Sequence, residues 1–359
     1  MRLRVRKTHP VMTIISTKNK MKNIAIIYGS DSSEWEVSIR SGEFTASQFD
    51  REQFNVYEVF ARFGKWVLAA YREGTNPRVS IPEQLRPDID KTDFSVNGFR
   101  WGSKLTFDFV YIMQHGTPGE NGLMQGYFEM LGIPFSSCSS FVSATTFDKF
   151  SCKSYLRDVP YVKCAKDIFL RKGQEVDPEQ WVAKLGLPMF VKPTDGGSSF
   201  GVTKVKRMED IVPAVEAAFA EGRTVIAEEA VVGREITCAV YTDEAGRSAA
   251  LPIIEIVPHT EWFDYEAKYN GLSDEICPAQ LDSETWEKVQ DTSRKIYGQL
   301  GCEGLVRIDY ILSDKGLYFL EMNTIPGMTS ASLVPKMVKA AGMSMTDFLT
   351  AVIKSKYRF

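Results

Sequence analysis

The sequence MFVKPTDGGSSFGVTKV, residues 189–205, contains two strand-like runs separated by a turn of small residues. The runs are Met189–Lys192 and Thr203–Val205, and the turn between them holds three glycines and two serines. Backbone amides of glycine can approach a polyphosphate closely, and the lysine that ends the first run supplies positive charge. The stretch fits neither GxxxxGK[ST] nor GxGxxG, so it predicts a hairpin that covers a nucleotide. A β-hairpin turn that needs glycine only for its shape is the alternative.

Two strands farther along the chain carry oxygen-bearing side chains. The runs Gly304–Leu312 and Leu317–Glu321 are separated by a turn at Ser313–Gly316, which predicts a second hairpin. Alternation predicts that each strand directs its candidate residues to one face: Arg307, Asp309, Phe319, Glu321 and Asn323. Two carboxylates and an amide oxygen suit Mg²⁺, and the neighbouring arginine suits a developing anion. A solvated strand face with an ordinary arginine–aspartate pair is the alternative.

The N-terminal third reads as a strand, a loop and a helix, followed by a second strand. Ile24–Tyr28 is apolar and β-branched, and it ends at the turn Gly29–Ser33. Side chains from Val37 to Phe44 have helical spacing, and Phe107–Met113 is a second buried strand. This order predicts a small doubly wound α/β domain whose functional loops follow the strands.

From residue 136 onward strands and helices alternate. Further helices are predicted at 144–156, 177–185, 210–220, 283–300 and 335–353. Further strands are predicted at 165–170, 224–228, 235–241 and 251–257. The pattern predicts a mixed α/β architecture with more than one domain.

Length and composition narrow the class of protein. A chain of 359 residues with 44% hydrophobic and 25% charged residues predicts a globular protein of two or three domains. Residues 1–20 hold six basic residues and no acid, so the other 37 basic and 46 acidic residues leave a charge of −9. An acidic body gives no electrostatic reason for nucleic-acid binding. The basic leader 1–20 is interpreted as a disordered tail or the product of an upstream start codon.

Cysteine spacing and hydropathy indicate the compartment. The six cysteines form no CxxC pair, which favours reduced, mostly buried thiols. No run approaches the roughly 18 apolar residues of a membrane helix. The sequence therefore predicts a cytoplasmic enzyme, with neither a membrane nor a nucleic acid as partner.

Three more stretches carry candidate site residues. Glu228 and Glu229 end a short strand and Glu235 follows the next turn, where acids could contact ribose or an adenine amine. Ordinary surface carboxylates are the alternative. His115 begins a glycine-rich loop after a buried strand, where α/β sheets bind ligands, although a lone histidine can be structural. The aromatic and charged run 262–269 reads as an active-site loop or as an ordinary surface loop.

Read in order, seven stretches closely resemble the D-alanine–D-alanine ligase family of the ATP-grasp superfamily. They are GSDSSEWEVSIRSG (29–42), HGTPGENGLMQG (115–126), FDK (147–149), VKPTDGGSSFG (191–201), DYEAKY (264–269), VRID (306–309) and EMNTIPGMTSASL (321–333). The resemblance covers about residues 21–357. It implies an α/β protein, α+β in its ATP-binding part, in which an ATP-grasp fold follows a small doubly wound parallel-sheet domain. The expected domains are an N-terminal α/β domain at 21–137, a central ATP-grasp subdomain at 138–230 and a C-terminal ATP-grasp and substrate domain at 231–359.

The resemblance implies ATP-dependent ligation of two D-alanine molecules for peptidoglycan precursor synthesis, through a D-alanyl phosphate. Two anions meet in the first step, so cations have to neutralise the phosphoryl oxygens. The implied cofactors are ATP and two Mg²⁺ ions, replaceable by Mn²⁺, with Asp309, Glu321 and Asn323 as metal ligands. Implied nucleotide contacts are Lys149, Lys192, Ser198, Ser199, Glu228, Glu229, Val231, Glu235 and Lys268. Lys149 and Lys192 would hold ATP phosphates, and Lys268 the γ-phosphate.

The remaining roles are likewise implied by the resemblance. The implied catalytic and substrate-binding residues are Glu34, His115, Ser198, Tyr269, Arg307, Gly327, Ser332 and Leu333. Glu34 would attract the ammonium of the first D-alanine near His115, and would link to Ser198 and Tyr269. Arg307 and the Gly327 amide would stabilise the oxyanion. Ser332 and the Leu333 amide would bind the second carboxylate, and a homodimer is expected.

The chain departs from the family pattern at a few positions, and other readings stay open. Glu229 stands where several members have lysine, which predicts altered ATP affinity, and Phe263 replaces a tyrosine. Asp195 and Gly196 replace an Arg-Glu or similar pair. The YEAKY pattern favours an amino acid acceptor over D-lactate. The alternatives are a D-lactate or D-serine ligase of the same fold and a non-catalytic nucleotide-binding regulator, while a nicotinamide oxidoreductase lacks the glycine spacing it needs.

Overall fold

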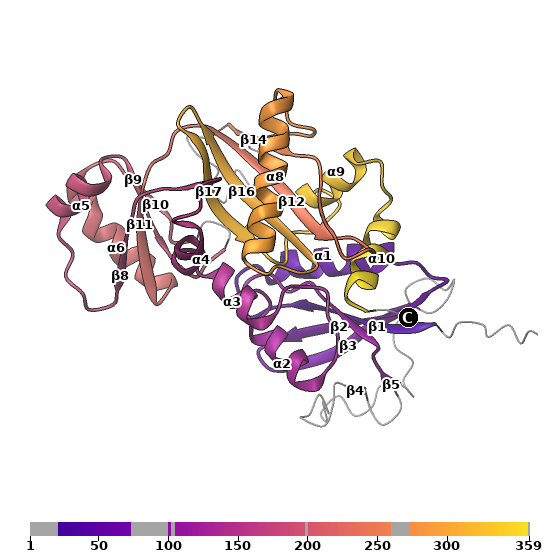
Figure 1. Ribbon diagram of the computed structural model, residues 1–359. Coiled ribbons are helices and arrows are strands. Elements are labelled where there is room, and N and C mark those ends of the chain that lie inside the picture. The colour runs from indigo at the N-terminus through magenta and orange to yellow at the C-terminus, as the bar shows by residue number, and fades with distance from the viewer. Residues whose placement is uncertain (1–20, 73–99, 102–104, 198–199, 260–272, 358–359) are drawn as a thin grey trace, which may run out of the picture.

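The computed structural model describes residues 21–72, 100–101, 105–197, 200–259 and 273–357. Outside this part of the chain lie the predicted leader 1–20 and four predicted site residues: Ser198, Ser199, Lys268 and Tyr269. The chain forms three larger β-sheets, and helices pack against them (Figure 1). A two-stranded ribbon is formed by β4 (Arg100–Trp101) and β5 (Leu105–Thr106).

The N-terminal sheet has the strand order β3-β2-β1-β6. Its strands are β1 (Lys22–Gly29), β2 (Phe54–Arg62), β3 (Lys65–Arg72) and β6 (Phe109–Ile112). β1 pairs in parallel with β2 and β6, whereas β3 runs antiparallel at the edge. The helices of this region are α1 (Trp35–Gln48) and α2 (Leu123–Leu131). Gly42 lets α1 lie directly on β1, because a Cβ at this position would overlap the Tyr28 ring.

A small antiparallel sheet, in the order β10-β9-β11-β8, forms the part drawn at the left of Figure 1. Its strands are β8 (Asp167–Arg171), β9 (Met189–Pro193), β10 (Thr203–Val205) and β11 (Thr224–Glu229). The helices beside it are α5 (Pro178–Leu185), a 3₁₀ turn at Met208–Asp210, and α6 (Ile211–Glu221). Trp181, Val191 and Ile211 are buried in a core of its own. The antiparallel pairing of β9 and β10 confirms the predicted hairpin.

The largest sheet has the order β15-β14-β12-β16-β17-β7, with β13 paired to β12. Its strands are β7 (Lys163–Cys164), β12 (Arg234–Thr242), β13 (Ser248–Ala250), β14 (Ile254–Pro258), β15 (Ser273–Ile276), β16 (Leu305–Ser313) and β17 (Gly316–Asn323). The long helix α8 (Ser283–Gln299) crosses one face of this sheet in Figure 1. The side chains of Ile296 and Tyr310 join this helix to the strands in a buried core.

The helix predicted at 144–156 is wrong, because the chain forms two helices there. α3 (Ser140–Phe147) and α4 (Lys149–Leu156) meet at Asp148, whose backbone is extended with φ −81° and ψ 107°. The Asp148 carboxylate accepts a hydrogen bond from the Ser151 amide at 2.7 Å and so caps α4. The break makes Lys149 the first residue of α4, where its amide donates to the Thr194 carbonyl at 2.9 Å.

The single helix predicted at 335–353 is also wrong. The chain forms α9 (Leu333–Ala340) and α10 (Met345–Lys356), separated by Gly342 with φ +73°. Ser344 then caps α10 by accepting a hydrogen bond from the Asp347 amide at 3.0 Å. A left-handed glycine followed by a capping serine ends one helix and starts another, although the apolar spacing continues.

The two C-terminal helices complete the core of the N-terminal sheet. Phe348 and Val352 of α10 lie in the same buried cluster as Ile24 and Phe109. Figure 1 shows α10 close to α1 and the N-terminal strands. The first and last parts of the chain therefore share one core, whereas the small antiparallel sheet has another.

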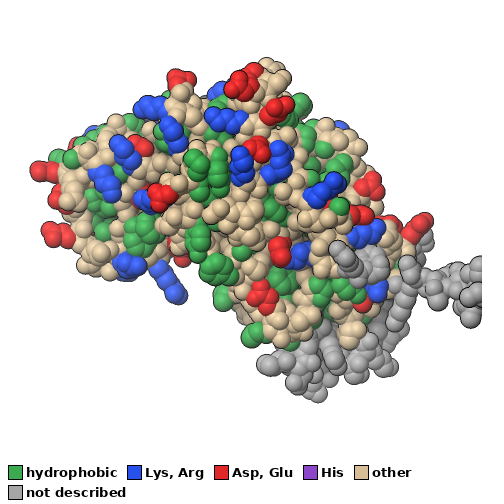
Figure 2. Space-filling view, in the orientation of Figure 1, with side chains coloured by type: hydrophobic (Ala, Val, Ile, Leu, Met, Phe, Trp, Pro, Cys, Tyr) green, Lys and Arg blue, Asp and Glu red, His purple; other side chains and the backbone are tan. Residues whose placement is uncertain are grey.

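The surface carries charges of both signs. On the face shown in Figure 2, Lys and Arg side chains are interspersed with Asp and Glu over the described residues. In that part of the chain, no helix combines the length and the apolar character that crossing a membrane requires.

Candidate active site

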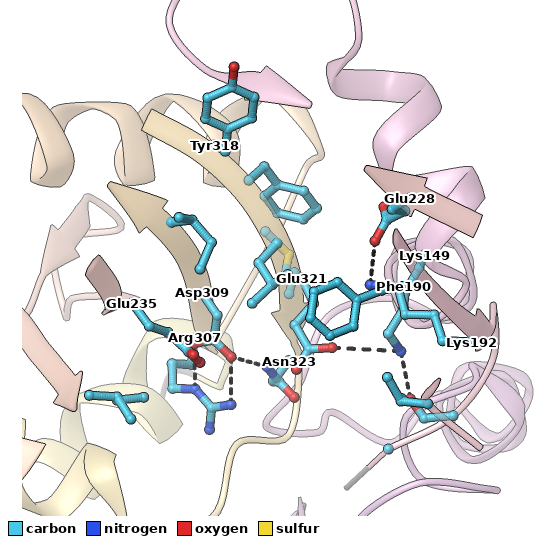
Figure 3. Close-up of a pocket in the computed structure, with 18 of the residues that line it drawn as sticks. Lys149, Phe190, Lys192, Glu228, Glu235, Arg307, Asp309, Tyr318, Glu321 and Asn323 are labelled. Carbon is cyan, nitrogen blue, oxygen red and sulfur yellow. Dashed lines mark hydrogen bonds and ion pairs between the residues drawn. The ribbon is translucent and has the colours of Figure 1, made fainter. Parts of the chain in front are cut away.

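A cavity of about 730 Å³ opens between the small antiparallel sheet and the largest sheet. Residues that follow β1 and β6 also reach it, so the N-terminal part of the chain contributes loop and helix side chains to the lining. Figure 3 shows Lys149, Lys192 and Glu228 on one side, and Arg307 and Asp309 on the other. Every predicted site residue within the described ranges lines this cavity.

The β16–β17 hairpin forms one wall of the cavity. Arg307 lies opposite Asn323 in the register, and Asp309 lies opposite Glu321. The Arg307 guanidinium donates to both Asp309 carboxylate oxygens, at 2.9 and 2.8 Å, and the Asn323 amide nitrogen donates to Asp309 at 3.1 Å. Thr237 of β12 adds a fourth donor at 2.5 Å. The prediction that the two strands pair and bring these side chains together is confirmed.

The predicted position of Phe319 is wrong. A β-bulge lies opposite the step from Asp309 to Tyr310, so Leu320 has no partner in the register. The extra residue reverses the alternation of β17, since residues beyond a bulge change faces. Phe319 therefore pairs with Tyr310 in the buried core and is 3% exposed, whereas Glu321 and Asn323 pair with Asp309 and Arg307.

The Arg307 guanidinium is held in its charged form. Burial alone would lower its pKa, but the carboxylates of Asp309, Glu321 and Glu120 outweigh burial and raise it. A partly buried, permanent cation beside two carboxylates can stabilise negative charge that develops on a reacting group.

The oxygen atoms on this hairpin fit a divalent cation. Asp309 and Glu321 offer carboxylates on paired strands. Asn323 offers its side-chain amide oxygen, while the nitrogen of the same amide donates a hydrogen bond to Asp309. An all-oxygen set of few protein ligands suits Mg²⁺, which usually keeps positions for phosphates and water. The Lys149 ammonium lies 3.6 Å from Glu321, on the opposite side of the same space.

Two lysines face the hairpin from the small sheet and α4. Lys149 donates to the Gly196 carbonyl at 2.6 Å, which ties α4 to the glycine-rich turn. The side chain of Lys192, on β9, lines the cavity, and its ammonium forms an ion pair with the Glu228 carboxylate of β11 at 2.5 Å. The two ammonium groups place positive charge across from the carboxylates of β16 and β17, as a polyphosphate with a bound cation would require.

Glu228 is a buried carboxylate between two lysines. Burial raises its pKa, but the charges of Lys192 and Lys153 outweigh burial and lower it to about 2. Because this pKa is lower in the folded chain than the ordinary 4.5, the ionised group stabilises the fold above pH 4.5. That stabilisation is lost as the pH falls from 4.5 towards 2.

We expect the Glu228→Gln protein to lack this acid-dependent loss of stability. For the unaltered chain, the contribution of Glu228 to the free energy of unfolding should fall by on the order of 3 kcal/mol between pH 4.5 and pH 2. Urea unfolding followed by circular dichroism at several pH values in this range measures it. Equal pH dependence in the two proteins would contradict the assignment of Glu228 as the ionised partner of both lysines.

The N-terminal loops close the other end of the cavity. Both ring nitrogens of His115 form hydrogen bonds, Nδ1 with the Ile325 carbonyl at 3.0 Å and Nε2 with the Ser41 hydroxyl at 2.9 Å. Burial is the main reason that its pKa is lowered. Glu120 accepts hydrogen bonds from the Gly116 amide at 2.7 Å and from the Ile325 amide at 3.3 Å. These contacts join the loop after β6 to the loop after β17.

Glu34 lies where this loop meets the glycine-rich turn. A Cβ on Gly197 would lie 2.5 Å from the Glu34 carboxylate, and one on Gly116 would lie 3.2 Å from it. Glycine is therefore needed at both positions for the carboxylate to sit between them. The charge of Glu34 adds to burial in raising the pKa of Glu120 to about 8. Ser41 and Glu120 were given no role from the sequence, although both fall inside motifs that the resemblance uses.

The N-terminus of α9 forms the far edge of the same end. Ser332 accepts a hydrogen bond from the Thr329 amide at 3.0 Å, and its hydroxyl lies 2.7 Å from the Thr329 hydroxyl. A Cβ on Gly327 would approach the Ser332 hydroxyl to 3.1 Å. Ser332, Leu333 and Gly327 all line the cavity.

Acidic and apolar residues line the end of the cavity near the loop from β11 to β12. Glu235 of β12 lies opposite Ile311, and Val231 lines the cavity beside Glu229. One Glu229 oxygen accepts a hydrogen bond from the Lys166 amide at 2.9 Å, so this side chain is turned towards the start of β8.

Comparison with known proteins identifies the architecture. The family model described as the D-ala D-ala ligase N-terminus matches residues 23–138, and the one for the C-terminus matches residues 154–354. The chain belongs to the D-alanine–D-alanine ligase family. It is 46% identical to the D-alanine–D-alanine ligase of Phocaeicola vulgatus over 94% of this chain and 99% of the relative. It is 42% identical to that of Flavobacterium johnsoniae over 93% of this chain and 99% of the relative.

Solved structures of the ligase family have the same fold. The VanG D-Ala:D-Ser ligase from Enterococcus faecalis is 30% identical, with a TM-score of 0.76 over 93% of this chain and 99% of that one. The D-alanine–D-alanine ligase from Bacillus anthracis complexed with ATP is 28% identical, with a TM-score of 0.70 over 93% of this chain and 96% of that one. These likenesses confirm the predicted ATP-grasp fold.

Proposed function

We propose that this chain joins two D-alanine molecules into D-alanyl-D-alanine, with ATP converted to ADP and phosphate. The observation that supports this most is the pairing of Arg307 and Asp309 with Asn323 and Glu321 across a cavity from Lys149 and Lys192. A binding module has no need for a partly buried arginine directed at an oxygen-ligand set. The family membership and the names of its curated relatives point to the same reaction.

In the proposed first step, a carboxylate oxygen of one D-alanine attacks the γ-phosphorus of ATP. The bond from that phosphorus to the bridging oxygen breaks, ADP leaves, and a D-alanyl phosphate forms. Lys149 and Lys192 bring cations to the phosphates, so that two anions can meet. We propose two Mg²⁺ sites, with Mn²⁺ as a substitute, held by Asp309, Glu321 and Asn323. When bound there, the ions neutralise phosphoryl oxygens.

In the proposed second step, the amine of the second D-alanine attacks the acyl carbon, the bond from that carbon to the phosphate oxygen breaks, phosphate leaves, and the nitrogen loses a proton to water. The oxyanion that develops lies within reach of Arg307 and the Gly327 amide. Glu34 attracts the ammonium of the first D-alanine beside His115, and Ser332 with the Leu333 amide holds the second carboxylate. The contributions of Ser198, Ser199, Lys268 and Tyr269 remain predictions from the family motifs.

An acceptor other than D-alanine is less well supported. One structural relative is named as a D-Ala:D-Ser ligase at 30% identity, whereas curated relatives at 42–46% are named as D-alanine–D-alanine ligases. We also propose that the chain acts as a cytoplasmic homodimer, with domains at 21–137, 138–230 and 231–359.

Phosphate release from Mg·ATP tests this function directly. We expect release with D-alanine but not with L-alanine or without an amino acid, and a product with the mass of two alanines minus water. A mixture of D-lactate and D-alanine should yield mainly the dipeptide near neutral pH. Preferential formation of the ester would move the assignment to a D-lactate ligase, and ATP binding without release would favour a regulator.

A further inference from the structure

Lys153 is a buried lysine on the second turn of α4, behind the end of the cavity that is proposed to hold the nucleotide. Its side chain is 0% exposed and does not line the cavity. The ammonium donates to the Ala165 carbonyl at 3.0 Å, pairs with Asp167 at 2.9 Å, and forms a short ion pair with Glu228. Burial alone would lower its pKa, but Glu228 and Asp167 outweigh burial, so the group stays charged.

These groups form a chain of alternating charges that leads to the cavity. Its members are Arg157, Asp167, Lys153, Glu228 and Lys192, in this order. Arg157 is half-exposed, and the next three side chains are buried. Only the last two members line the cavity. Through Glu228, the arrangement connects Lys153, which does not line the cavity, to Lys192, the lysine proposed to hold ATP phosphates.

The geometry around Asp167 shows why Lys153 is directed to Glu228. Arg157 donates to both Asp167 oxygens, at 3.2 and 3.1 Å, so that carboxylate already has a cation. The two Glu228 oxygens are divided between Lys153 on Oε1 and Lys192 on Oε2. A buried carboxylate needs compensating charge, and losing one partner leaves the remaining partner to supply all of it.

This division matters for the ligand, because Glu228 competes with a phosphate for Lys192. With Lys153 in place, half of the compensation for Glu228 comes from behind the site, and the charge of Lys192 remains available to the cavity. Without Lys153, Lys192 would be neutralised by Glu228 alone, and the site would lose one positive charge.

Resting on the proposed function, we propose that Lys153 is a positioning residue for ATP. It holds the rear oxygen of Glu228, and so sets the position of Glu228 and leaves the charge of Lys192 for the polyphosphate. It touches neither substrate, and its effect passes through Glu228.

The Lys153→Met protein tests this inference. We expect the KM for ATP to rise at least tenfold, with the KM for D-alanine and kcat within threefold of the unaltered chain. Calorimetric titration with ADP should show the same loss of affinity without turnover. Lys172→Met, at an exposed turn, removes the same charge and should change neither KM. Asp167→Asn removes a charge from the same chain but leaves Lys153 on Glu228, and should change the KM for ATP less than threefold.

A double-mutant cycle with Glu228→Gln separates positioning from general stability. If Lys153 acts through Glu228, Lys153→Met should lower the affinity for ADP at least tenfold in the chain that retains Glu228. In the Glu228→Gln background it should lower that affinity no more than about twofold. Equal costs in both backgrounds, or a loss of kcat with the KM for ATP unchanged, would overturn the inference.

A second variant tests the inference if the Lys153→Met protein folds poorly. Should Lys153→Met fail to fold, Lys153→Gln keeps a donor without the charge, and an unchanged ADP affinity in that protein would equally overturn it. Failure of the unaltered chain to release phosphate would instead reject the proposed function, since ADP titration requires no catalysis.

Discussion

Replacing Glu321 with alanine is expected to abolish phosphate release while the fold is retained. The substitution removes one of the two carboxylates on the β16–β17 hairpin, opposite Asp309 and 3.6 Å from the Lys149 ammonium. Without it, the proposed cation site loses half of its negative charge, and the phosphoryl oxygens lose the neutralisation that a held cation supplies. A loss of several kcal/mol in transition-state stabilisation corresponds to a fall in kcat of about 10³ or more.

Phosphate release at saturating ATP, D-alanine and Mg²⁺ measures this effect. Glu287→Ala removes a carboxylate from an exposed position on α8 and serves as the matched control. Thermal unfolding followed by circular dichroism should show both variants folded. Mg²⁺-dependent turnover that survives in the Glu321→Ala protein would remove this hairpin from the reaction.

Replacing Arg307 with lysine is expected to lower kcat by about 10²–10³, the cost of removing one donor from an oxyanion site. Lysine keeps the positive charge but cannot donate to both Asp309 oxygens and to a developing oxyanion with a planar fork. The KM for ATP should change less than kcat, because Arg307 is proposed to act on the reacting carbonyl.

Dipeptide formation followed by mass spectrometry, together with phosphate release, tests the Arg307 assignment. Phosphate released in excess of dipeptide would indicate that the acyl phosphate forms but is lost to water. A kcat equal to that of the unaltered chain would show that Arg307 serves only as the partner of Asp309.

Elements with a strong local pattern could be predicted from the sequence. The β9–β10 and β16–β17 hairpins have apolar alternation and a turn between them, and both form as expected. Alternation failed at Leu320, because a bulge adds one residue without leaving a sign in the polarity pattern. Two predicted helices are broken at Asp148 and Gly342, where single capping residues outweigh continuous apolar spacing.

Contacts between distant segments carry no periodic signal. The partners of Lys153 come from β8 and β11, so the charge chain could not be read from spacing along α4. The link from Glu120 to the Ile325 amide spans 205 residues. Sequence reasoning reached the main candidates through motifs, and it missed the residues that hold them in place.

The packing of α10 against β1 has a consequence for synthesis on the ribosome. Ile24 leaves the ribosome early, but Phe348 and Val352, which share its core, are among the last residues to be made. The N-terminal sheet therefore emerges with part of its apolar surface uncovered and completes its core only when translation ends. The small antiparallel sheet, with a core drawn from residues 170–227, can fold while later residues are still being added. A messenger truncated just before α10 would encode every proposed active-site residue and still yield a chain open to chaperones and proteases.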